Sequence, residues 1–447
     1  MVSVGTELLL GQIANTNARF LAQCLAELGI DSYYQQVVGD NRVRLAEALR
    51  LALARSDLVI TTGGLGPTED DLTKETVAEV LGLELVSDPA TAERIRGLLC
   101  AQRSRVAESA VAKQSLVLEG AEVFPNPVGT APGLGVRAGG RVVVLLPGPP
   151  AELEAVVREH VVPWLERLLA AGGVWPASTR TGPRNFLCSR VVKVCGLGEP
   201  AVEEALGDLV RSANPTVAPL VTTGETHVRV TAAAGSKEEA GRLAGEMAEL
   251  VASRLEPHVF GFDDETLPSA CGKLLREGGL TLALAESLTG GLVGHLLTEV
   301  PGASDYFERG VVVYSNRSKT ELCGVPDELL KAHGAVSEPV ASAMARGIRE
   351  RSGTDLGLAL TGIAGPTGGT STKPVGLVYI ALAGPGGVRC ERYVFAGGRS
   401  VVKLRAAQRA LTLLWERLRL GVDTPTPEVA RDGVSGGPAG PEGHHRG

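Results

Sequence analysis

The chain has 447 residues, which is too long for one ordinary core, so we expect two or three domains. Hydrophobic residues make up 44% and can fill large cores, whereas aromatic residues make up only 4% and the formal charge is −7. Direct binding of nucleic acid, which favours basic and aromatic surfaces, is therefore not expected. The seven cysteines form no C-x-x-C pair, and no apolar run approaches the roughly 20 residues of a membrane span. Since the first residues also lack a basic leader, we expect a cytoplasmic protein without membrane contact.

Residues 1–170 alternate between strand and helix patterns. Apolar runs and helical spacing predict strands at 1–4, 31–38, 58–61 and 141–146, and helices at 15–28, 42–54, 73–81, 90–100 and 151–169. Repeated β-α units favour a mainly parallel sheet covered by helices on both faces. This segment is therefore predicted to be a three-layer α/β domain.

A glycine-rich turn follows the strand predicted at 58–61. Its sequence is T-T-G-G-L-G-P-T-E-D-D (residues 61–71), in which Gly63, Gly64 and Gly66 would let backbone amides approach a ligand. Asp70 and Asp71 could hold a hard divalent cation that bridges to phosphates. The alternative is a tight turn before an acidic helix start. Neither a Walker loop nor a G-x-G-x-x-G turn after the first strand is present, which argues against a P-loop enzyme and a dinucleotide-dependent oxidoreductase.

A smaller unit is predicted at residues 171–262. Residues 170–184 are rich in Gly, Pro, Ser and Thr and are predicted to form a linker. Strands at 187–194, 216–221, 227–233 and 259–260 and helices at 201–209 and 238–255 then follow in the order β-α-β-β-α-β. We find no chemistry-bearing motif in this small α+β domain, whose expected role is spacing or dimer contact.

Residues 263–421 form a second predicted α/β domain. Helices are predicted at 267–277, from Leu292, at 340–351 and at 400–418, with strands at 281–285, 310–314, 356–360, 376–382 and 387–395. The last residues, 422–447, combine Pro, Gly and charge and cannot bury enough apolar surface to become ordered. We therefore expect a disordered tail.

The most informative turn of this domain is A-E-S-L-T-G-G (residues 285–291), between a buried strand and a helix. The first amides of a helix are unpaired and carry positive partial charge, so such a turn favours an anion. Ser287, Thr289, Gly290 and Gly291 are thus candidate ligands for a phosphorylated molecule. Ser287 is also a candidate nucleophile.

Two further polar stretches, residues 302–319 and 361–369, complete this set. Ser304 lies in a short polar loop, Tyr314 ends the strand predicted at 310–314, and Lys319 follows. A lysine that burial keeps neutral can activate a serine without a histidine. Thr361 and Gly362 would supply hydroxyl and amide donors to an oxyanion or phosphate. Spacing alone favours the alternative in which Ser304 is a helix cap and Lys319 a solvated helix residue.

Taken together, these motifs resemble the CinA family over residues 1–420. The first domain resembles the molybdopterin-binding fold of MogA- and MoeA-type proteins through G-T-E-L-L-L-G, T-T-G-G-L-G-P-T-E-D-D and L-P-G-P-P-A-E. The third resembles the PncC-type nicotinamide mononucleotide deamidase through A-E-S-L-T-G-G, Y-F-E-R-G-V-V-V-Y-S-N, H-G-A-V-S-E-P-V and T-G-I-A-G-P-T-G-G.

The resemblance implies hydrolysis of the carboxamide of nicotinamide mononucleotide, without a cofactor, to nicotinic acid mononucleotide and ammonia. Ser304 would be the nucleophile, Lys319 its base and Tyr314 an assisting group. Other residues are expected to contact the nucleotide, namely Ser287, Thr289, Gly290, Gly291, Thr361 and Gly362. Arg399 and Arg405 are the candidates for binding its phosphate.

For the first domain the resemblance implies ADP-ribose pyrophosphatase activity with a divalent cation near Asp70 and Asp71. The alternative is a domain that binds a pterin or nucleotide without turnover, in a competence- or damage-linked partner protein. The expected partners are small-molecule nucleotides, and a homodimer is expected from the family and from the frequency of such assemblies.

Overall fold

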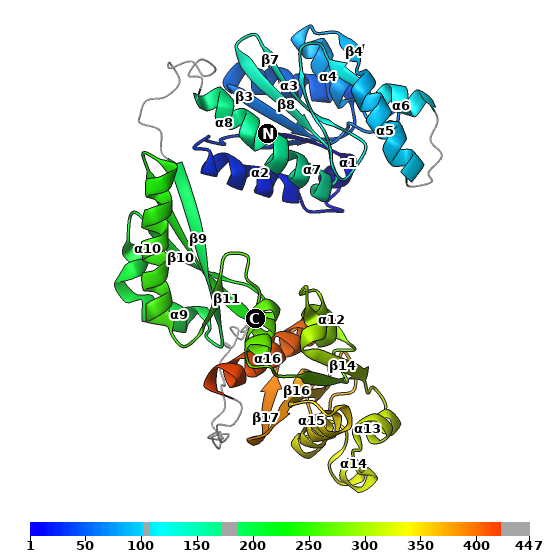
Figure 1. The fold of residues 1–447 in the computed structure, drawn as a ribbon, viewed down its shortest axis with the longest axis vertical. Coiled ribbons are helices and arrows are strands. Elements are labelled where there is room, and N and C mark those ends of the chain that lie inside the picture. The colour runs from blue at the N-terminus through cyan, green and yellow to red at the C-terminus, as the bar shows by residue number, and fades with distance from the viewer. Residues whose placement is uncertain (102–107, 171–185, 422–447) are drawn as a thin grey trace, which may run out of the picture. The chain divides into compact units, whose positions relative to one another are not determined.

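The computed structural model describes residues 1–101, 108–170 and 186–421 (Figure 1). Most of the predicted linker and the whole predicted tail lie outside these ranges. Among the described residues, no helix combines the length and apolarity needed to cross a membrane. The contacts divide the chain into two compact units, residues 1–189 with 231–246, and residues 190–230 with 247 onward.

The N-terminal sheet has six strands in the order β2-β1-β3-β8-β7-β6. The first four run parallel, and β7 and β6 add antiparallel strands at one edge. Its strands are β1 (Val2–Val4), β2 (Gln36–Val38), β3 (Leu58–Thr62), β6 (Glu122–Phe124), β7 (Gly133–Ala138) and β8 (Arg141–Leu146), and a separate pair is formed by β4 (Leu85–Ser87) and β5 (Leu116–Leu118). The predicted mainly parallel sheet is confirmed.

Helices cover both faces of this sheet because successive strand residues point to opposite sides. Val59 packs in the core that contains residues of α3 and α4, whereas its neighbour Ile60 packs in the core that contains residues of α2, α7 and α8. The helices of the domain are α1 (Thr6–Leu9), α2 (Thr16–Glu27), α3 (Arg42–Arg55), α4 (Thr73–Leu81), α5 (Pro89–Ala101), α6 (Glu108–Gln114), α7 (Pro150–Val156) and α8 (Val162–Ala170), the last two joined by a π-helical turn (Val157–Val161). The three-layer prediction is therefore confirmed.

The middle segment has the predicted β-α-β-β-α-β order. Its elements are β9 (Phe186–Cys195), α9 (Glu199–Leu206), β10 (Thr216–Val221), β11 (Glu225–Ala234), α10 (Lys237–Leu255) and β12 (Val259–Phe262), with a 3-10 turn (Gly207–Arg211) after α9. The sheet order is β10-β11-β9-β12.

The C-terminal sheet has five strands in the order β14-β13-β15-β16-β17. The strands β13 (Leu282–Glu286), β14 (Phe307–Val312) and β15 (Leu356–Gly362) are parallel, and β16 (Leu377–Gly384) and β17 (Gly387–Val394) are antiparallel. Its helices are α11 (Leu267–Glu277), α12 (Leu292–Thr298), α13 (Asn316–Cys323), α14 (Asp327–His333), α15 (Glu338–Ser352) and α16 (Arg399–Leu420).

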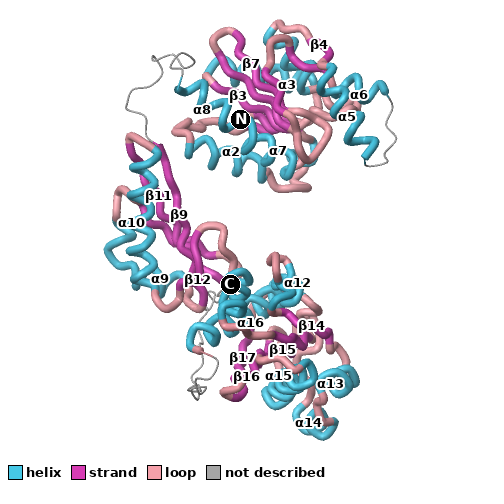
Figure 2. Tube along the Cα trace, viewed as in Figure 1, coloured by secondary structure: helices cyan, strands magenta, loops and turns pink. Residues whose placement is uncertain are grey.

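The two faces of the C-terminal sheet differ in side-chain size. Leu282 and Leu284 of β13 pack in the core that contains α11 and α16, and Ala283 and Ala285 pack in the core that contains α15. Figures 1 and 2 show α12 and α16 on one side of the strands and α13, α14 and α15 on the other. The small alanine side chains let α15 approach the sheet closely, and a Cβ at Gly357 would lie 2.3 Å from the Ala345 carbonyl oxygen.

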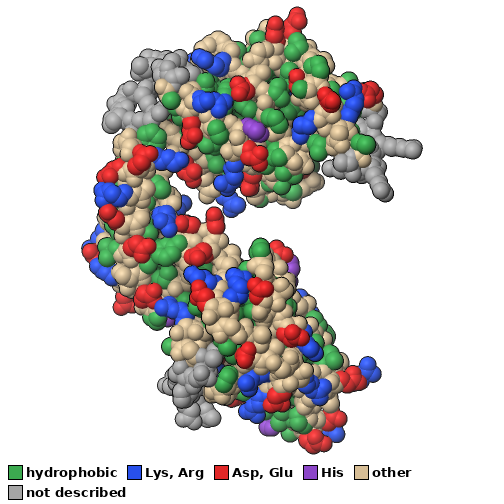
Figure 3. Space-filling model, viewed as in Figure 1, with side chains coloured by type: hydrophobic (Ala, Val, Ile, Leu, Met, Phe, Trp, Pro, Cys, Tyr) green, Lys and Arg blue, Asp and Glu red, His purple; other side chains and the backbone are tan. Residues whose placement is uncertain are grey.

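On the face of the molecule seen in Figure 3, basic and acidic side chains of the described residues are interspersed rather than sorted into broad patches. The N-terminal domain contains a buried lysine. Lys74 of α4 is 2% exposed, and its ammonium donates hydrogen bonds to the carbonyls of Lys113 (2.9 Å), Gln114 (3.1 Å) and Leu116 (3.1 Å). Burial lowers the pKa of Lys74 to about 8. This lysine ties α4 to the segment that leads into β5.

The Lys74 pKa sets a pH dependence of stability. Its folded-state value of about 8 lies below the 10.5 of an exposed lysine, so between these values the unfolded chain binds more protons and stability rises with pH. From pH 7 to pH 9.5 we expect the unfolding free energy of the wild type to gain about 2 kcal/mol relative to Lys74→Met. Urea unfolding of both proteins across this range measures the difference, and parallel pH curves would contradict it.

Candidate active site

The carboxyl ends of β13, β14 and β15 meet at one edge of the C-terminal sheet, because these strands are parallel. Glu286, the last residue of β13, pairs with Val312 on one side and with Leu360 on the other. Ser287 follows directly, and its amide donates to the Leu360 carbonyl (3.0 Å). The predicted turn after β13 therefore lies beside the residues that end β14 and β15.

Lys319 of α13 reaches into this edge. The helix begins with a capping box between Ser315 and Ser318, and this start fixes how its first turn leaves the sheet. Lys319 is 2% exposed, and its Nζ lies 3.2 Å from the Ser287 Oγ, 2.8 Å from the Val313 carbonyl oxygen and 3.4 Å from that of Tyr314. The structure therefore brings together a buried lysine and a serine that is itself 8% exposed.

Burial shifts the Lys319 amine toward its neutral form. Burial, which disfavours the charged form, lowers the pKa of Lys319 from that of a free lysine. A neutral amine has two N–H donors and one lone pair. The carbonyls of Val313 and Tyr314 can accept the two donors, which leaves the lone pair for the Ser287 hydroxyl. In this arrangement Lys319 can take a proton from Ser287.

The predicted pairing of Ser304 with Lys319 is wrong. Ser304 lies in an exposed 3-10 turn (Ala303–Asp305) that precedes β14, and Phe307 at the start of β14 pairs with Leu282 at the start of β13. Ser304 is thus at the amino edge of the sheet and Lys319 at the carboxyl edge, separated by the length of a six-residue strand, roughly 20 Å. The sequence prediction began this strand at Gly310 rather than at Phe307. Ser304 and Lys319 are close along the chain, but β14 runs between them from one edge of the sheet to the other.

Tyr314 lies beyond β14 rather than at its end, and its side chain is 61% exposed. Its hydroxyl accepts a hydrogen bond from the Arg399 guanidinium (2.9 Å), which also donates to the Gly365 carbonyl (2.9 Å). The contact of Tyr314 with Lys319 is made by its backbone carbonyl. Tyr314 and Arg399 are therefore partners of each other at the rim of the edge.

Thr361 and Gly362 end β15. Thr361 is buried, and its hydroxyl donates to the Ala335 carbonyl (2.8 Å), which ties this strand end to the loop before α15. A Cβ at Gly362 would lie 2.6 Å from the Leu377 carbonyl oxygen of the neighbouring strand. Close strand packing thus requires glycine at this position, independently of any ligand.

The turn after Ser287 is shaped by glycines in left-handed conformation, Gly290 (φ 66°) and Gly291 (φ 96°). Thr289 is 1% exposed, and its hydroxyl has no hydrogen-bond partner among the described residues. A free buried hydroxyl costs stability unless a ligand satisfies it. Thr289 is therefore a candidate substrate contact.

The start of α12, predicted to attract an anion, already holds one. The buried carboxylate of Glu286 accepts hydrogen bonds from the amides of Gly291 (3.0 Å), Val293 (3.2 Å) and Gly294 (2.8 Å). The start of α12 binds an anion, as predicted, but this anion is a side chain of the protein rather than a ligand. A substrate phosphate would need other partners.

One cation near the turn was missed. A Cβ at Gly290 would lie 3.8 Å from the Lys403 Nζ, and Lys403 is one helical turn beyond Arg399 on α16. Arg405, predicted as a phosphate contact, donates instead to the Ala396 carbonyl (3.0 Å). The i, i+4 spacing from Arg399 could have identified Lys403, because residues so spaced share one face of a helix.

In the N-terminal domain, the turn after β3 lies at the carboxyl edge of its parallel strands. Gly63 (φ 92°) and Gly64 (φ 68°) are left-handed, and Cβ atoms there would lie 2.3 Å from the Val4 carbonyl oxygen and 2.2 Å from the Thr73 hydroxyl. A Cβ at Gly66 would lie 2.4 Å from the Asp71 carboxylate. Gly63 and Gly64 are therefore required by the conformation of the turn itself, whereas the neighbour of Gly66 is a side-chain carboxylate that can move.

Asp70 and Asp71 both point to Thr68. Asp71 accepts from the Thr68 amide (2.9 Å) and hydroxyl (2.5 Å), and Asp70 also accepts from that hydroxyl, which lowers the pKa of Asp70. Among the described residues, no group of three or more His, Cys, Asp or Glu side chains is arranged to hold a metal ion. The two carboxylates do not by themselves fit a preformed cation site.

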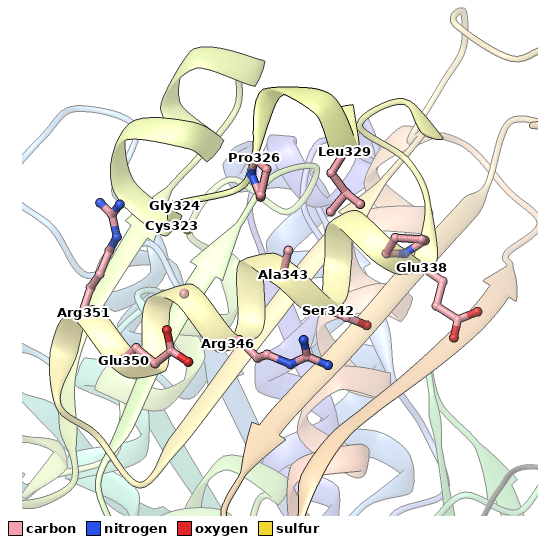
Figure 4. Close-up of a pocket in the computed structure, with 12 residues that line it drawn as sticks. Cys323, Gly324, Pro326, Leu329, Glu338, Ser342, Ala343, Arg346, Glu350 and Arg351 are labelled. Atoms are coloured by element: carbon pink, nitrogen blue, oxygen red, sulfur yellow. The ribbon is translucent and has the colours of Figure 1, made fainter. Parts of the chain in front are cut away.

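A groove of about 910 Å³ runs along the outer side of α15 (Figure 4). Arg346 and Glu350 extend from the helix, and the opposite wall includes Pro326 and Leu329 near α14. Its lining mixes both charges with apolar groups and contains none of the predicted site residues. We assign no ligand to it.

Comparisons with known proteins place these features in a family. The family model described as the CinA C-terminal domain matches residues 264–418, the probable molybdopterin binding domain matches residues 1–167, and the damage-inducible protein CinA KH domain matches residues 189–261. A solved structure of a competence/damage inducible protein from Agrobacterium tumefaciens is 39% identical and covers 34% of this chain and 93% of that chain, with a TM-score of 0.33.

Two relatives extend over most of the chain. A CinA-like protein of Dictyoglomus turgidum is 43% identical over 415 residues, which are 93% of this chain and 97% of that protein. A protein of Moorella thermoacetica, named as a candidate competence-damage inducible protein, is 48% identical over 418 residues, which are 94% of this chain and 98% of that protein. The chain therefore belongs to the CinA family and combines a molybdopterin-binding-type N-terminal domain with a CinA C-terminal domain.

Proposed function

We propose that the C-terminal domain is an amidase that hydrolyses nicotinamide mononucleotide to nicotinic acid mononucleotide and ammonia. The observation that carries this proposal is the 3.2 Å contact between the Ser287 Oγ and the buried Lys319 Nζ. Serine activated by a neutral lysine is a known solution for amide hydrolysis. The choice of substrate rests on the family resemblance of the motifs around this pair.

The reaction follows from the geometry of the pair. Neutral Lys319 takes the Ser287 proton as the oxygen attacks the carboxamide carbon, and the resulting ammonium gives a proton to the departing nitrogen, which leaves as ammonia. The acyl group is then an ester of Ser287. Water attacks this ester as Lys319 takes a proton from it, Lys319 passes that proton to the departing Ser287 oxygen, and the released acid loses its proton to solvent to become the carboxylate. One water is consumed, and serine and lysine return to their starting states.

Other groups at this edge would bind the rest of the substrate. The unpartnered Thr289 hydroxyl can donate to the carbonyl oxygen on which negative charge develops. Lys403 and Arg399 supply positive charge for the 5′-phosphate, since Glu286 already occupies the start of α12. No cofactor has a role in this scheme.

Substitution of the pair tests the nucleophile directly. Ser287→Ala and Lys319→Met should each lower ammonia release from nicotinamide mononucleotide by at least about 10³-fold, because each removes a group that makes or breaks bonds. Ser304→Ala, at the opposite edge, should stay within about twofold of the wild type. A coupled ammonia assay on the purified full-length proteins decides between them, and a loss confined to Ser304→Ala would reverse the assignment.

The pH dependence tests the base. Since the reaction needs neutral Lys319 and burial lowers its pKa, kcat/KM should rise with pH along an acid limb whose midpoint lies below the 10.5 of a free lysine. Steady-state rates between about pH 5 and about pH 11 locate this midpoint. A limb centred at or above the free-lysine value would show that the amine is not held in a desolvating site.

We propose that the N-terminal domain binds a phosphorylated nucleotide or pterin at the carboxyl edge of β1, β3 and β8. Support comes from the turns after β3 and β8, whose backbones meet there, since a Cβ at Gly148 would lie 3.5 Å from the Gly63 Cα. Turns without side chains leave backbone amides accessible to phosphate oxygens. Cleavage of ADP-ribose is the more specific proposal, and a cation bound there would have to take most of its ligands from the substrate.

Full-length Ser287→Ala protein separates this activity from the amidase. With ADP-ribose and Mg²⁺, Mn²⁺ or Co²⁺, it should release AMP, and Asp71→Asn in the same background should reduce the rate by at least about tenfold because the loop carboxylate is neutralised. Chromatography of the nucleotide products provides the measurement. Binding of ADP-ribose by calorimetry without AMP formation under any metal would leave the domain as a binding module.

A further inference from the structure

The α12 helix is capped from outside its own first turn. Its N-cap residue, Gly291, has no side chain to accept a hydrogen bond from the helix amides. The acceptor is the Glu286 carboxylate, which lies before the Ser287 turn and is 2% exposed. Helix amides are normally capped by the side chain of the N-cap residue itself. The use of a residue five positions earlier therefore calls for an explanation.

The three hydrogen bonds of Glu286 bridge the Ser287 turn. One carboxylate oxygen accepts from Gly291 and Val293, and the other from Gly294. The carboxylate therefore fastens the end of β13 to the start of α12 and closes the intervening turn into a short ring. Charge-assisted hydrogen bonds of this type are stronger than those between neutral groups.

The backbone of the same residue is fixed to the lysine-bearing segment. The Val313 amide donates to the Glu286 carbonyl (2.8 Å), and the Val313 carbonyl in turn accepts from the Lys319 Nζ (2.8 Å). On the other side, the Ser287 amide donates to Leu360. Glu286 is thus joined through hydrogen bonds to the start of α12 and to Val313, the residue whose carbonyl accepts from Lys319.

Glu286 is not placed to act on a substrate. It is buried, and both of its carboxylate oxygens accept hydrogen bonds from backbone amides. We propose that Glu286 is a positioning residue: its carboxylate holds the Ser287 turn closed, so that the hydroxyl meets the lone pair of Lys319. This inference rests on the proposed function for its chemistry but on the hydrogen bonds above for its geometry.

The proposal is tested on the full-length chain with Glu286→Ala, which removes the clamp and leaves a cavity the size of a small carboxylate. Since a misplacement of about 1 Å can cost about 10²-fold in rate, kcat should fall by about 10² while KM changes less than threefold. Formate or acetate, which can occupy the cavity, should raise the kcat of Glu286→Ala at least about tenfold. The same carboxylates should not affect the wild type.

Asp355→Ala is the matched control. The Asp355 carboxylate also accepts from a backbone amide, that of Thr281 (2.8 Å), but lies at the opposite edge of the same sheet. It should lower thermal stability, as Glu286→Ala does, yet keep kcat within about twofold and show no response to formate. Equal losses of kcat in both variants without rescue, or wild-type kcat in Glu286→Ala, would overturn the proposal.

A measurement of Ser287 reactivity that does not use the substrate separates the positioning role of Glu286 from the proposed amidase activity. A fluorophosphonate reacts with activated serines, and its rate of attachment to Ser287, mapped by peptide mass spectrometry, should fall about 10²-fold in Glu286→Ala and recover with formate. If labelling of Ser287 falls in Glu286→Ala and recovers with formate, but the wild type releases no ammonia from nicotinamide mononucleotide, the proposed substrate is wrong and the positioning role stands. Absence of labelling in the wild type would overturn both.

Discussion

The chemistry proposed for this protein depends on the burial of one amine. Lys319 is withdrawn from water at the carboxyl edge of the C-terminal sheet, where two backbone carbonyls and the Ser287 hydroxyl surround its Nζ. Desolvation disfavours its charged form, and the neutral form has one lone pair, which can accept the Ser287 proton. The parallel strands, the α13 capping box and the glycine-rich turn after β13 all serve to bring these two side chains together.

The order of elements could be predicted closely because hydrophobic periodicity is local. The helices Thr73–Leu81 and Leu267–Glu277 match their predicted bounds at both ends, and the polar turns after β3 and β13 were found where strands end. The strand β6 and the helices α13 and α14 were not predicted because they are short, and β7 was not predicted because its two glycines interrupt the apolar pattern. Their patterns differ little from those of loops.

The site was only partly predictable. Ser287 and Lys319 were both named, but the family resemblance joined Lys319 to Ser304, and only the parallel pairing of β13 with β14 shows that a strand separates them. Glu286 carried no signal beyond an acidic residue before a turn, because its role depends on amides of the following helix. Lys403 was hidden among the basic residues of α16. In each case the missing information was a contact between distant segments.

The central claim is that the Ser287 oxygen becomes covalently bonded to the acyl group of the substrate. Rapid acid quench of the full-length protein mixed with nicotinamide mononucleotide, followed by peptide mass spectrometry, tests it most directly. The peptide that contains Ser287 should gain the mass of the substrate minus that of ammonia. This adduct should form before steady-state turnover and be absent in Lys319→Met. The same adduct on the peptide that contains Ser304 would contradict it.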